Sequence, residues 1–136
     1  ELILDGLHVH PHVARLVWDA APGRVALITD AMAAAAEADG DYRLGTLNVS
    51  VRDGLAVLSG TDTIAGSTLT QDVALRGAIG MGAEPAAAVA ALTAVPARAI
   101  GETKLGRLSP GYAADVVALD PAWQVTAVWG AGRRLS

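Results

Sequence analysis

The sequence predicts an α/β fold in which parallel strands alternate with helices. Two apolar runs, residues 1–4 and Arg24–Thr29, lie on either side of a stretch with helical periodicity that begins at Pro11, so a β-α-β unit fits within about 30 residues. Asp5 and Asp30 directly follow these runs, and the catalytic side chains of a (β/α) barrel stand at the C-terminal ends of its strands. We therefore expect part of such a barrel, because 136 residues are well short of the roughly 250 in a complete one.

Local signals place the first helix and the strands after it. Pro11 suits the first position of a helix, and apolar side chains then recur at helical spacing. Farther on, Tyr42–Val51 and Leu55–Leu58 are β runs joined by Arg52-Asp53-Gly54, whose Asp-Gly pair is a strong hairpin signal. We expect this β-hairpin, at about residues 42–58, to interrupt the alternation of strands and helices.

The second half of the chain is expected to contain further helices and then a β-rich tail. Ser67 or Thr68 is predicted to cap the first of these helices. The expected helical segments are Leu69–Met81, Glu84–Thr93 and Ala97–Ile100. From Lys104 onward, short apolar runs are separated by Gly and Pro and show no helical periodicity. This division predicts a partial barrel over residues 1–103 and a small β module over residues 104–136.

The composition favours a packed protein that acts on small molecules. Hydrophobic residues make up 52% of the chain and charged residues 18%, which excludes general disorder. A net charge of −4 without a basic run argues against nucleic acid or an anionic membrane as a partner. The absence of cysteine excludes disulfides, thiolate metal ligands and a cysteine nucleophile, and it is compatible with the cytoplasm.

The N-terminal residues, ELILDGLHVHP, contain no basic segment followed by an apolar stretch of the length that a signal peptide or a membrane span needs. The chain starts without Met, in the middle of an apolar run. We therefore expect residue 1 to be the cut edge of a longer chain.

Three histidines near the N-terminus have two interpretations. His8 and His10 share a face if the strand continues, and such an H-x-H pair can ligate one Zn²⁺. Alternatively, they belong to a polar network or to the surface, because an isolated H-x-H is a weak metal signal. His12 follows Pro11 and is expected at the helix start, facing solvent.

Asp30 and a later loop are candidates for chemistry. Asp30 either caps the next element or acts as a metal ligand or general acid and base, and the small residues after it would let a substrate approach. The segment 64–67 precedes an expected helix, whose unpaired N–H groups could bind a polar substrate. The alternative for this segment is an ordinary capped helix start.

Six motifs occur together in an order that matches one family. They are DGLHVHP, LITDAM, DGDYRLG, IAGSTLTQD, PARAIG and GRLSPGYAADVVALD. The pattern G-x-L-x-x-G-x-x-A-D in the last motif is shared widely among metal-dependent amidohydrolases, whereas DGLHVHP together with TDAM and AGSTLT is specific. Over almost its whole length, the chain resembles the C-terminal portion of the N-acetylglucosamine-6-phosphate deacetylases.

This resemblance implies a fold, a reaction and a set of site residues. The family fold is a (β/α)8 TIM-like barrel with a small β-sandwich, to which residues 104–136 would contribute strands. The implied reaction is hydrolysis of N-acetylglucosamine 6-phosphate to glucosamine 6-phosphate and acetate, in the amino-sugar metabolism of the cytoplasm. Asp30 would be the catalytic acid and base, and His8 would reach the sugar. The residues that match the substrate loops are Asp5, Gly6, Leu7, His8, Ile64, Ala65 and Gly66.

The resemblance also implies a divalent metal, Zn²⁺ first and Fe or Mn as alternatives. The family's His and Glu ligands and its phosphate-binding Arg lie upstream of the matched segment, and its H-x-E-G-P motif does not occur in these 136 residues. Asp30 is therefore the sole metal-ligand candidate that the resemblance leaves in this chain. We expect the isolated polypeptide to be inactive, because Asp30 would then face an unactivated water.

The partner expected from the resemblance is a small amino-sugar phosphate, and the expected assembly is a homo-oligomer, a dimer by family resemblance. Two rival functions stay open at this point. One is a metal-dependent amidohydrolase that acts on another cyclic or N-acyl substrate. The other is a non-catalytic sugar-phosphate-binding or assembly module.

Overall fold

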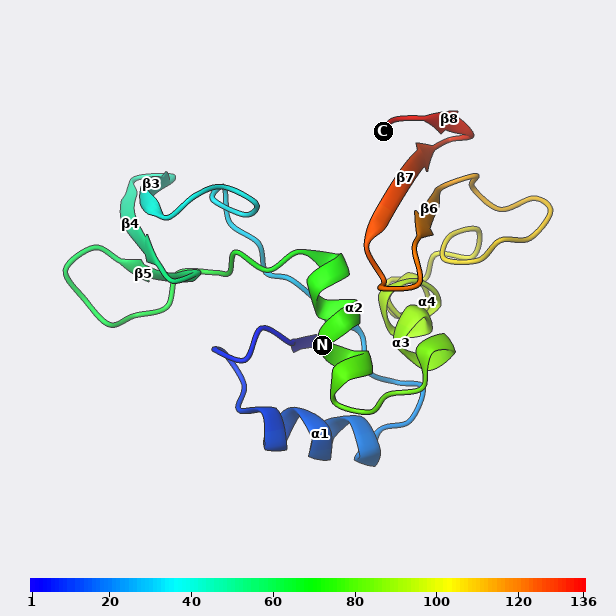
Figure 1. The fold of residues 1–136 in the computed structure, drawn as a ribbon, viewed down its shortest axis with the longest axis horizontal. Helices are drawn as coiled ribbons and strands as arrows, with labels where there is room; N and C mark the ends of the chain where they lie inside the picture. Colours follow the sequence, from blue (N-terminus) through cyan, green and yellow to red (C-terminus); the bar gives the residue numbers. More distant parts are fainter.

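The computed structural model describes all residues, 1–136, and contains α-helices and three separate β-sheets. The helices are α1 (Pro11–Ala20), α2 (Gln71–Gly80), α3 (Pro85–Leu92) and α4 (Ala94–Ala99). The strands are β1 (Leu2–Ile3), β2 (Leu27–Ile28), β3 (Gly40–Leu44), β4 (Leu47–Arg52), β5 (Leu55–Leu58), β6 (Val116–Leu119), β7 (Val125–Gly130) and β8 (Arg133–Arg134). In Figure 1, β3–β5 and β6–β8 extend to opposite sides of the central helices. The α/β class is confirmed, while these strands do not close into a barrel.

The first two strands form the predicted β-α-β unit. β1 and β2 pair in parallel with Leu2 opposite Leu27, and α1 connects them in sequence. The pairing covers two residues of each strand, fewer than the apolar runs that predicted them. Leu27 is buried in a core to which α2 and α3 contribute side chains. This core fixes the ends of β1 and β2, from which the two acid-bearing loops start.

Helix α1 begins at Pro11 as predicted, but much of its apolar face is open to solvent. Ala14 is fully buried, whereas Val13 and Leu16 are 48% and 68% exposed. Arg15 ties the helix to the end of α2 by donating a 2.7 Å hydrogen bond to the carbonyl oxygen of Met81. Helical spacing therefore predicts the helix correctly. It does not predict which of the helix's apolar side chains are buried.

The β excursion has three strands where two runs were predicted. The run Tyr42–Val51 is divided between β3 and β4, which pair antiparallel around Gly45-Thr46, and β5 pairs with β4. The predicted Asp-Gly turn is present between β4 and β5. Both Asp53 and Gly54 have positive φ, 51° and 76°, as a type I′ turn requires. The division was missed because the β-forming residues on both sides of Gly45 read as one run.

Helix α2 begins later than predicted and is not capped as predicted. Its N-cap is Thr70, which makes no capping hydrogen bond with its side chain. The hydroxyl of Ser67 donates to the carbonyl oxygen of Thr29, and that of Thr68 donates to the carbonyl oxygen of Gly54, 2.8 Å away. The capping prediction was wrong because both hydroxyls find acceptors in loops that are distant in sequence.

The next two helices lie close to their predicted positions. Glu84 caps α3, and its carboxylate accepts a 3.1 Å hydrogen bond from the backbone N–H of Ala87. α4 begins at Ala94 and not at Ala97. Pro96 is tolerated there because a residue in the first turn has no intrahelical acceptor for its N–H. None of the four helices is long and apolar enough to cross a membrane.

The tail contains no helix over residues 104–136, in agreement with the sequence pattern. β6, β7 and β8 form an antiparallel sheet in that order. Asp115 accepts a 2.7 Å hydrogen bond from the backbone N–H of Ala131, which supports the turn between β7 and β8. Arg76 of α2 donates to the carbonyl oxygen of Trp123, 3.1 Å away, and so connects the tail to the central helices.

Candidate functional site

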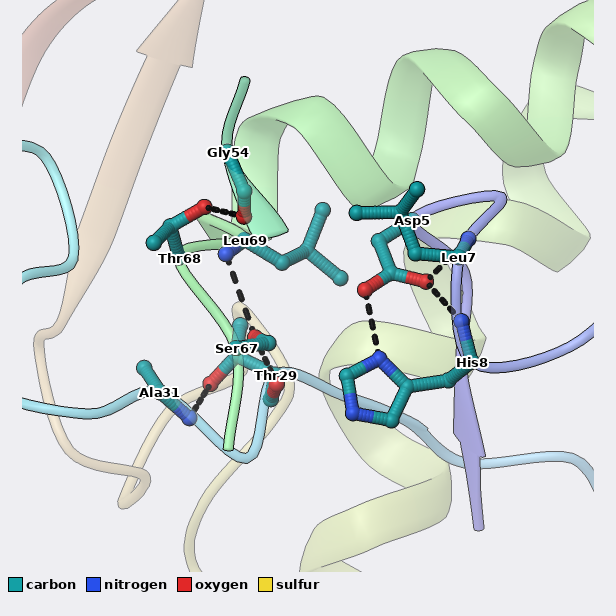
Figure 2. Close-up of polar contacts among 9 residues, drawn as sticks. All are labelled: Asp5, Leu7, His8, Thr29, Ala31, Gly54, Ser67, Thr68 and Leu69. Carbon is teal, nitrogen blue, oxygen red and sulfur yellow. Dashed lines mark hydrogen bonds and ion pairs between the residues drawn. The ribbon is translucent and has the colours of Figure 1, made fainter. Parts of the chain in front are cut away.

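The loop after β1 is organised around the carboxylate of Asp5. Its Oδ1 accepts hydrogen bonds from the backbone N–H groups of Leu7 and His8, both at 2.9 Å. Its Oδ2 lies 2.6 Å from Nδ1 of His8. Gly6 makes the turn possible with a φ of 77°, a value that residues with a side chain rarely adopt. Figure 2 shows the His8 ring held against Asp5 by these contacts.

The environment of Asp5 keeps its carboxyl group ionised at neutral pH. Burial by itself would raise the pKa of Asp5. Hydrogen bonds from the backbone N–H groups of His8 and Leu7, and then from the His8 ring, outweigh that effect and place the pKa below its ordinary value of 3.8. The pair is nearly enclosed, because the side chains of His8 and Asp5 are 17% and 9% exposed.

Asp30 lies directly past the end of β2 and has an uncommon backbone conformation. Its φ is 50°, in the left-handed region, which aspartate adopts more readily than most residues with a side chain. Its backbone carbonyl oxygen accepts a 2.8 Å hydrogen bond from the N–H of Ser67. Its carboxylate is exposed and makes no hydrogen bond or ion pair with the rest of the chain. An exposed carboxylate without a partner at a strand end is a candidate for chemistry.

Ser67 fastens the loop after β2 to the segment that precedes α2. It is 2% exposed and forms a parallel bridge with Ala31. Its hydroxyl donates to the carbonyl oxygen of Thr29 and accepts from the N–H of Leu69 at 3.1 Å. Its own carbonyl oxygen accepts from the N–H of Met32 at 2.9 Å. The sequence pattern did not predict that Ser67 joins these two segments. The one local signal of this role is a small polar residue directly after Gly66.

The predicted substrate segment Ile64, Ala65 and Gly66 lies against the Asp30 loop. A Cβ atom placed on Gly66 would stand 3.0 Å from the carbonyl oxygen of Asp30, and the φ of Gly66 is 78°. Ala65 is buried, and its N–H donates to the carbonyl oxygen of Ala56 at 3.0 Å. The segment is not a helix N-terminus, because α2 starts at Gln71. The prediction of a helix start here was therefore wrong, while the segment does lie next to Asp30.

The two groups of residues lie near one another at the start of α2. Figure 2 shows Asp5 and His8 on one side, Ser67 and Thr29 on the other, and the side chain of Leu69 between them. A hollow of about 510 Å³ adjoins this region. Among its lining residues are Asp5, Gly6, Leu7, Thr68 and Leu69. His8, Asp30 and residues 64–66 do not line it.

The three histidines have separate environments. His8 pairs with Asp5, while Nδ1 of His10 accepts a 3.3 Å hydrogen bond from the backbone N–H of His12 and so caps α1. The rings of His10 and His12 are in edge contact, with centroids 5.1 Å apart. No group of three or more His, Asp or Glu side chains gathers where it could hold a metal ion. The residues of this chain by themselves do not fit a complete metal site.

Comparison with known proteins identifies the family. The model of the amidohydrolase family matches residues 5–134. A relative from Escherichia coli K12, provisionally named an N-acetylgalactosamine-6-phosphate deacetylase, is 42% identical over 100% of this chain and 82% of its own length. The N-acetylglucosamine-6-phosphate deacetylase of Vibrio furnissii is 36% identical over 98% of this chain and 34% of its own length. The chain belongs to the amidohydrolase family, whose members are generally metal-dependent.

Solved structures give the same result for the fold. The N-acetyl-D-glucosamine-6-phosphate deacetylase of Mycobacterium smegmatis, solved as an aspartate-to-alanine variant in complex with N-acetyl-D-glucosamine-6-phosphate, superposes with a TM-score of 0.90. It is 43% identical, and the match covers 98% of this chain and 36% of that structure. The deacetylase of Thermotoga maritima has a TM-score of 0.90 at 30% identity, over 37% of its chain. This chain therefore spans about a third of the solved enzymes that it matches.

Proposed function

We propose that this chain is the C-terminal part of a metal-dependent deacetylase that hydrolyses N-acetylglucosamine 6-phosphate to glucosamine 6-phosphate and acetate. The observation that carries the proposal is the match to the M. smegmatis deacetylase over 98% of the chain. In this proposal residues 1–103 belong to a (β/α)8 barrel and residues 104–136 to a small β-sandwich. The enzyme is cytoplasmic and forms a homodimer.

Asp30 is the proposed catalytic acid and base. Its carboxylate is exposed and uncommitted, so it is available to accept a proton from the hydrolytic water and to pass one to the departing amine. Its backbone is held by Ser67 through a 2.8 Å hydrogen bond, so the carboxylate starts from a fixed position. Hydrolysis of an amide needs such a proton transfer, because the nitrogen leaves as an amine.

The loops on either side of the start of α2 are the proposed substrate contacts. They comprise Asp5, Gly6, Leu7 and His8 in one loop, and Ile64, Ala65 and Gly66 in the other. The ring of His8 is held by Asp5, and Gly66 lets the second loop pass close to the backbone carbonyl group of Asp30. The small residues that follow Asp30 would let a sugar approach its carboxylate.

The metal ligands of the proposed enzyme, Zn²⁺ being our first candidate, come from outside this segment. The residues described here form no cluster of three ligands, and a bound metal generally supplies Lewis-acid activation in such hydrolases. We therefore expect the 136-residue chain by itself to release no acetate.

A second substrate is favoured by the relatives themselves. The two E. coli relatives at 42% identity carry the name of an N-acetylgalactosamine-6-phosphate deacetylase, whereas the V. furnissii relative at 36% is named for N-acetylglucosamine 6-phosphate. The two sugars differ only in the configuration of one ring hydroxyl. N-acetylgalactosamine 6-phosphate is therefore the alternative substrate of the same chemistry.

Acetate release from both sugar phosphates tests the proposal. The 136-residue chain is compared with a longer form that supplies the remainder of the barrel, with Zn²⁺ added. We expect activity in the longer form, abolished by Asp30→Asn and retained by Asp62→Asn, an exposed aspartate without a side-chain partner. Acetate release that survives Asp30→Asn would refute the catalytic assignment. If the longer form released no acetate from either sugar phosphate, the deacetylase proposal would be refuted.

A further inference from the structure

The contacts of Asp5 determine which nitrogen of His8 carries a proton. Oδ1 of Asp5 is engaged by two backbone N–H groups, so Oδ2 is the oxygen that faces the ring, 2.6 Å from Nδ1. An ionised carboxylate can only accept hydrogen bonds. Nδ1 of His8 must therefore donate to it, and the proton of a neutral ring is on Nδ1.

The opposite nitrogen of the ring is then free to act on a ligand. Nε2 of His8 has no hydrogen-bond partner within the chain. In a neutral ring with a proton on Nδ1, Nε2 carries a lone pair and accepts hydrogen bonds. A hydroxyl group of a sugar is a donor that matches it.

We propose that Asp5 is a positioning residue that holds His8 in the Nδ1–H tautomer, so that Nε2 accepts a hydrogen bond from a hydroxyl group of the substrate. This assignment differs from a direct substrate contact by the Asp5 carboxylate, both of whose oxygens are occupied within the loop. It rests on the proposed function for the identity of the ligand, whereas the tautomer itself requires no substrate.

The variant Asp5→Asn separates this role from a structural one. The amide oxygen of an asparagine can accept from the N–H groups of Leu7 and His8, so the loop is preserved. Its amide nitrogen then faces the ring and can only donate, so Nδ1 must become the acceptor. We expect the tautomer of His8 to switch from Nδ1–H to Nε2–H while the loop stays folded.

Nitrogen-15 chemical shifts of the histidine rings test the proposal directly. The chain contains three histidines, so single His10→Asn and His12→Asn variants assign the signals. Spectra are recorded at about pH 8.5, so that the signals of neutral imidazole rings are read. We expect Nδ1 of His8 to show the shift of a protonated nitrogen in the original protein and that of an unprotonated nitrogen in Asp5→Asn, with His10 and His12 unchanged.

Two outcomes would overturn the proposal. One is a proton on Nε2 of His8 in the original protein, and the other is a tautomer that Asp5→Asn leaves unchanged. If Asp5→Asn unfolds the chain, the His8 tautomer of the original protein remains a test, because a proton on Nε2 would still contradict the proposal. Since no substrate or activity enters the measurement, failure of the deacetylase assay would not alter its result.

Discussion

Because Gly66 has no side chain, the loop that contains it can lie close to the Asp30 loop. A Cβ atom there would stand 3.0 Å from the carbonyl oxygen of Asp30, and the next residue, Ser67, donates its N–H to that same oxygen. The position of the catalytic candidate therefore depends on the absence of a side chain in a different loop. At this scale, stability and site geometry depend on the same atoms.

The variant Gly66→Ala should be destabilising by about 2–3 kcal/mol. About 1 kcal/mol comes from a left-handed φ with a side chain, and about 1–2 kcal/mol from crowding against the Asp30 carbonyl group. Urea unfolding measures the loss. Gly60→Ala is the matched control, because Gly60 has a φ of 81° with open space around its Cβ position. Equal losses in the two variants would show that the contact with Asp30 is unimportant.

Asp5 gives a pH dependence whose sign follows from its lowered pKa. Because the folded-state pKa lies below the ordinary 3.8, the stabilisation by ionised Asp5 is present above that value and is lost as the pH falls through the folded pKa. The difference in unfolding free energy between the original protein and Asp5→Asn should therefore shrink below about pH 4. Urea titrations at a series of pH values measure it. If this difference in unfolding free energy stayed constant down to the lowest pH measured, the lowered pKa of Asp5 would be contradicted.

Part of the candidate site can be predicted at the level of single residues. Asp30 is recognisable because it follows an apolar run and precedes small residues, and the structure places it at that strand end. The catalytic and substrate roles of the site residues stay predictions. The bonds of Ser67 to Thr29 and Met32 could not be predicted, because they join segments more than 30 residues apart and leave no periodic pattern.

At the scale of elements, α1 shows how a loop side chain can define a helix start. The helix begins with Pro11, which contributes no N–H, so His12 offers one of the first backbone donors. Nδ1 of His10 accepts it at 3.3 Å. This use of His10 agrees with the polar-network interpretation of the H-x-H pair more simply than with the metal-pair interpretation, because Nδ1 of His8 is engaged by Asp5.

The cap of α1 can be tested with two substitutions at one position. His10→Ala should lower the unfolding free energy by about 0.5 kcal/mol, because the cap is lost and the bond is long. His10→Asn should match or exceed the original stability, since asparagine is among the best N-cap residues. Thermal unfolding compares the three proteins. Equal melting temperatures for the Ala and Asn variants would argue against a capping role.

Local signals predicted most helices and strands, and tertiary contacts account for the errors. The Asp53-Gly54 turn and the N-terminus of α1 were correct because each depends on its own residues. The start of α2 was wrong because the hydroxyl of Ser67 bonds to Thr29 and does not cap a helix. Burial on α1 could not be predicted, because helical spacing identifies a face without identifying what covers it.

At the scale of the whole molecule, few contacts connect the tail to the central helices. Gly106 provides one of them, because a Cβ atom placed there would stand 2.6 Å from the backbone of Thr93, where α3 ends. Arg76 provides another through the carbonyl oxygen of Trp123. The first glycine of the G-x-L-x-x-G-x-x-A-D pattern is thus the point where the tail crosses the junction of α3 and α4.

Gly106→Ala should be among the most damaging single substitutions in this chain. The crowding is against backbone atoms that cannot rotate away, so we expect a loss of about 3 kcal/mol in unfolding free energy. Gly111→Ala is the control, because Gly111 has a φ of 83° and no atom near its Cβ position. Urea unfolding should show a loss of about 1 kcal/mol for the control. A Gly106→Ala protein as stable as the control would mean that the tail can shift without cost.

The bonds of Ser67 also have a consequence for how the chain length can vary. Residues 59 and 60 form an exposed turn on one side of the candidate site, and its hydrogen bonds join Leu58, Thr61 and Thr63, so an added residue there would disturb the turn without acting directly on Ser67. On the other side, Ser67 and Leu69 are joined by a hydrogen bond between hydroxyl and backbone, and an added residue would break it and displace the support of Asp30. We therefore expect an insertion in this turn to be tolerated better than an insertion between Ser67 and Leu69, and homologous chains should differ in length at the turn more often than at Ser67–Leu69.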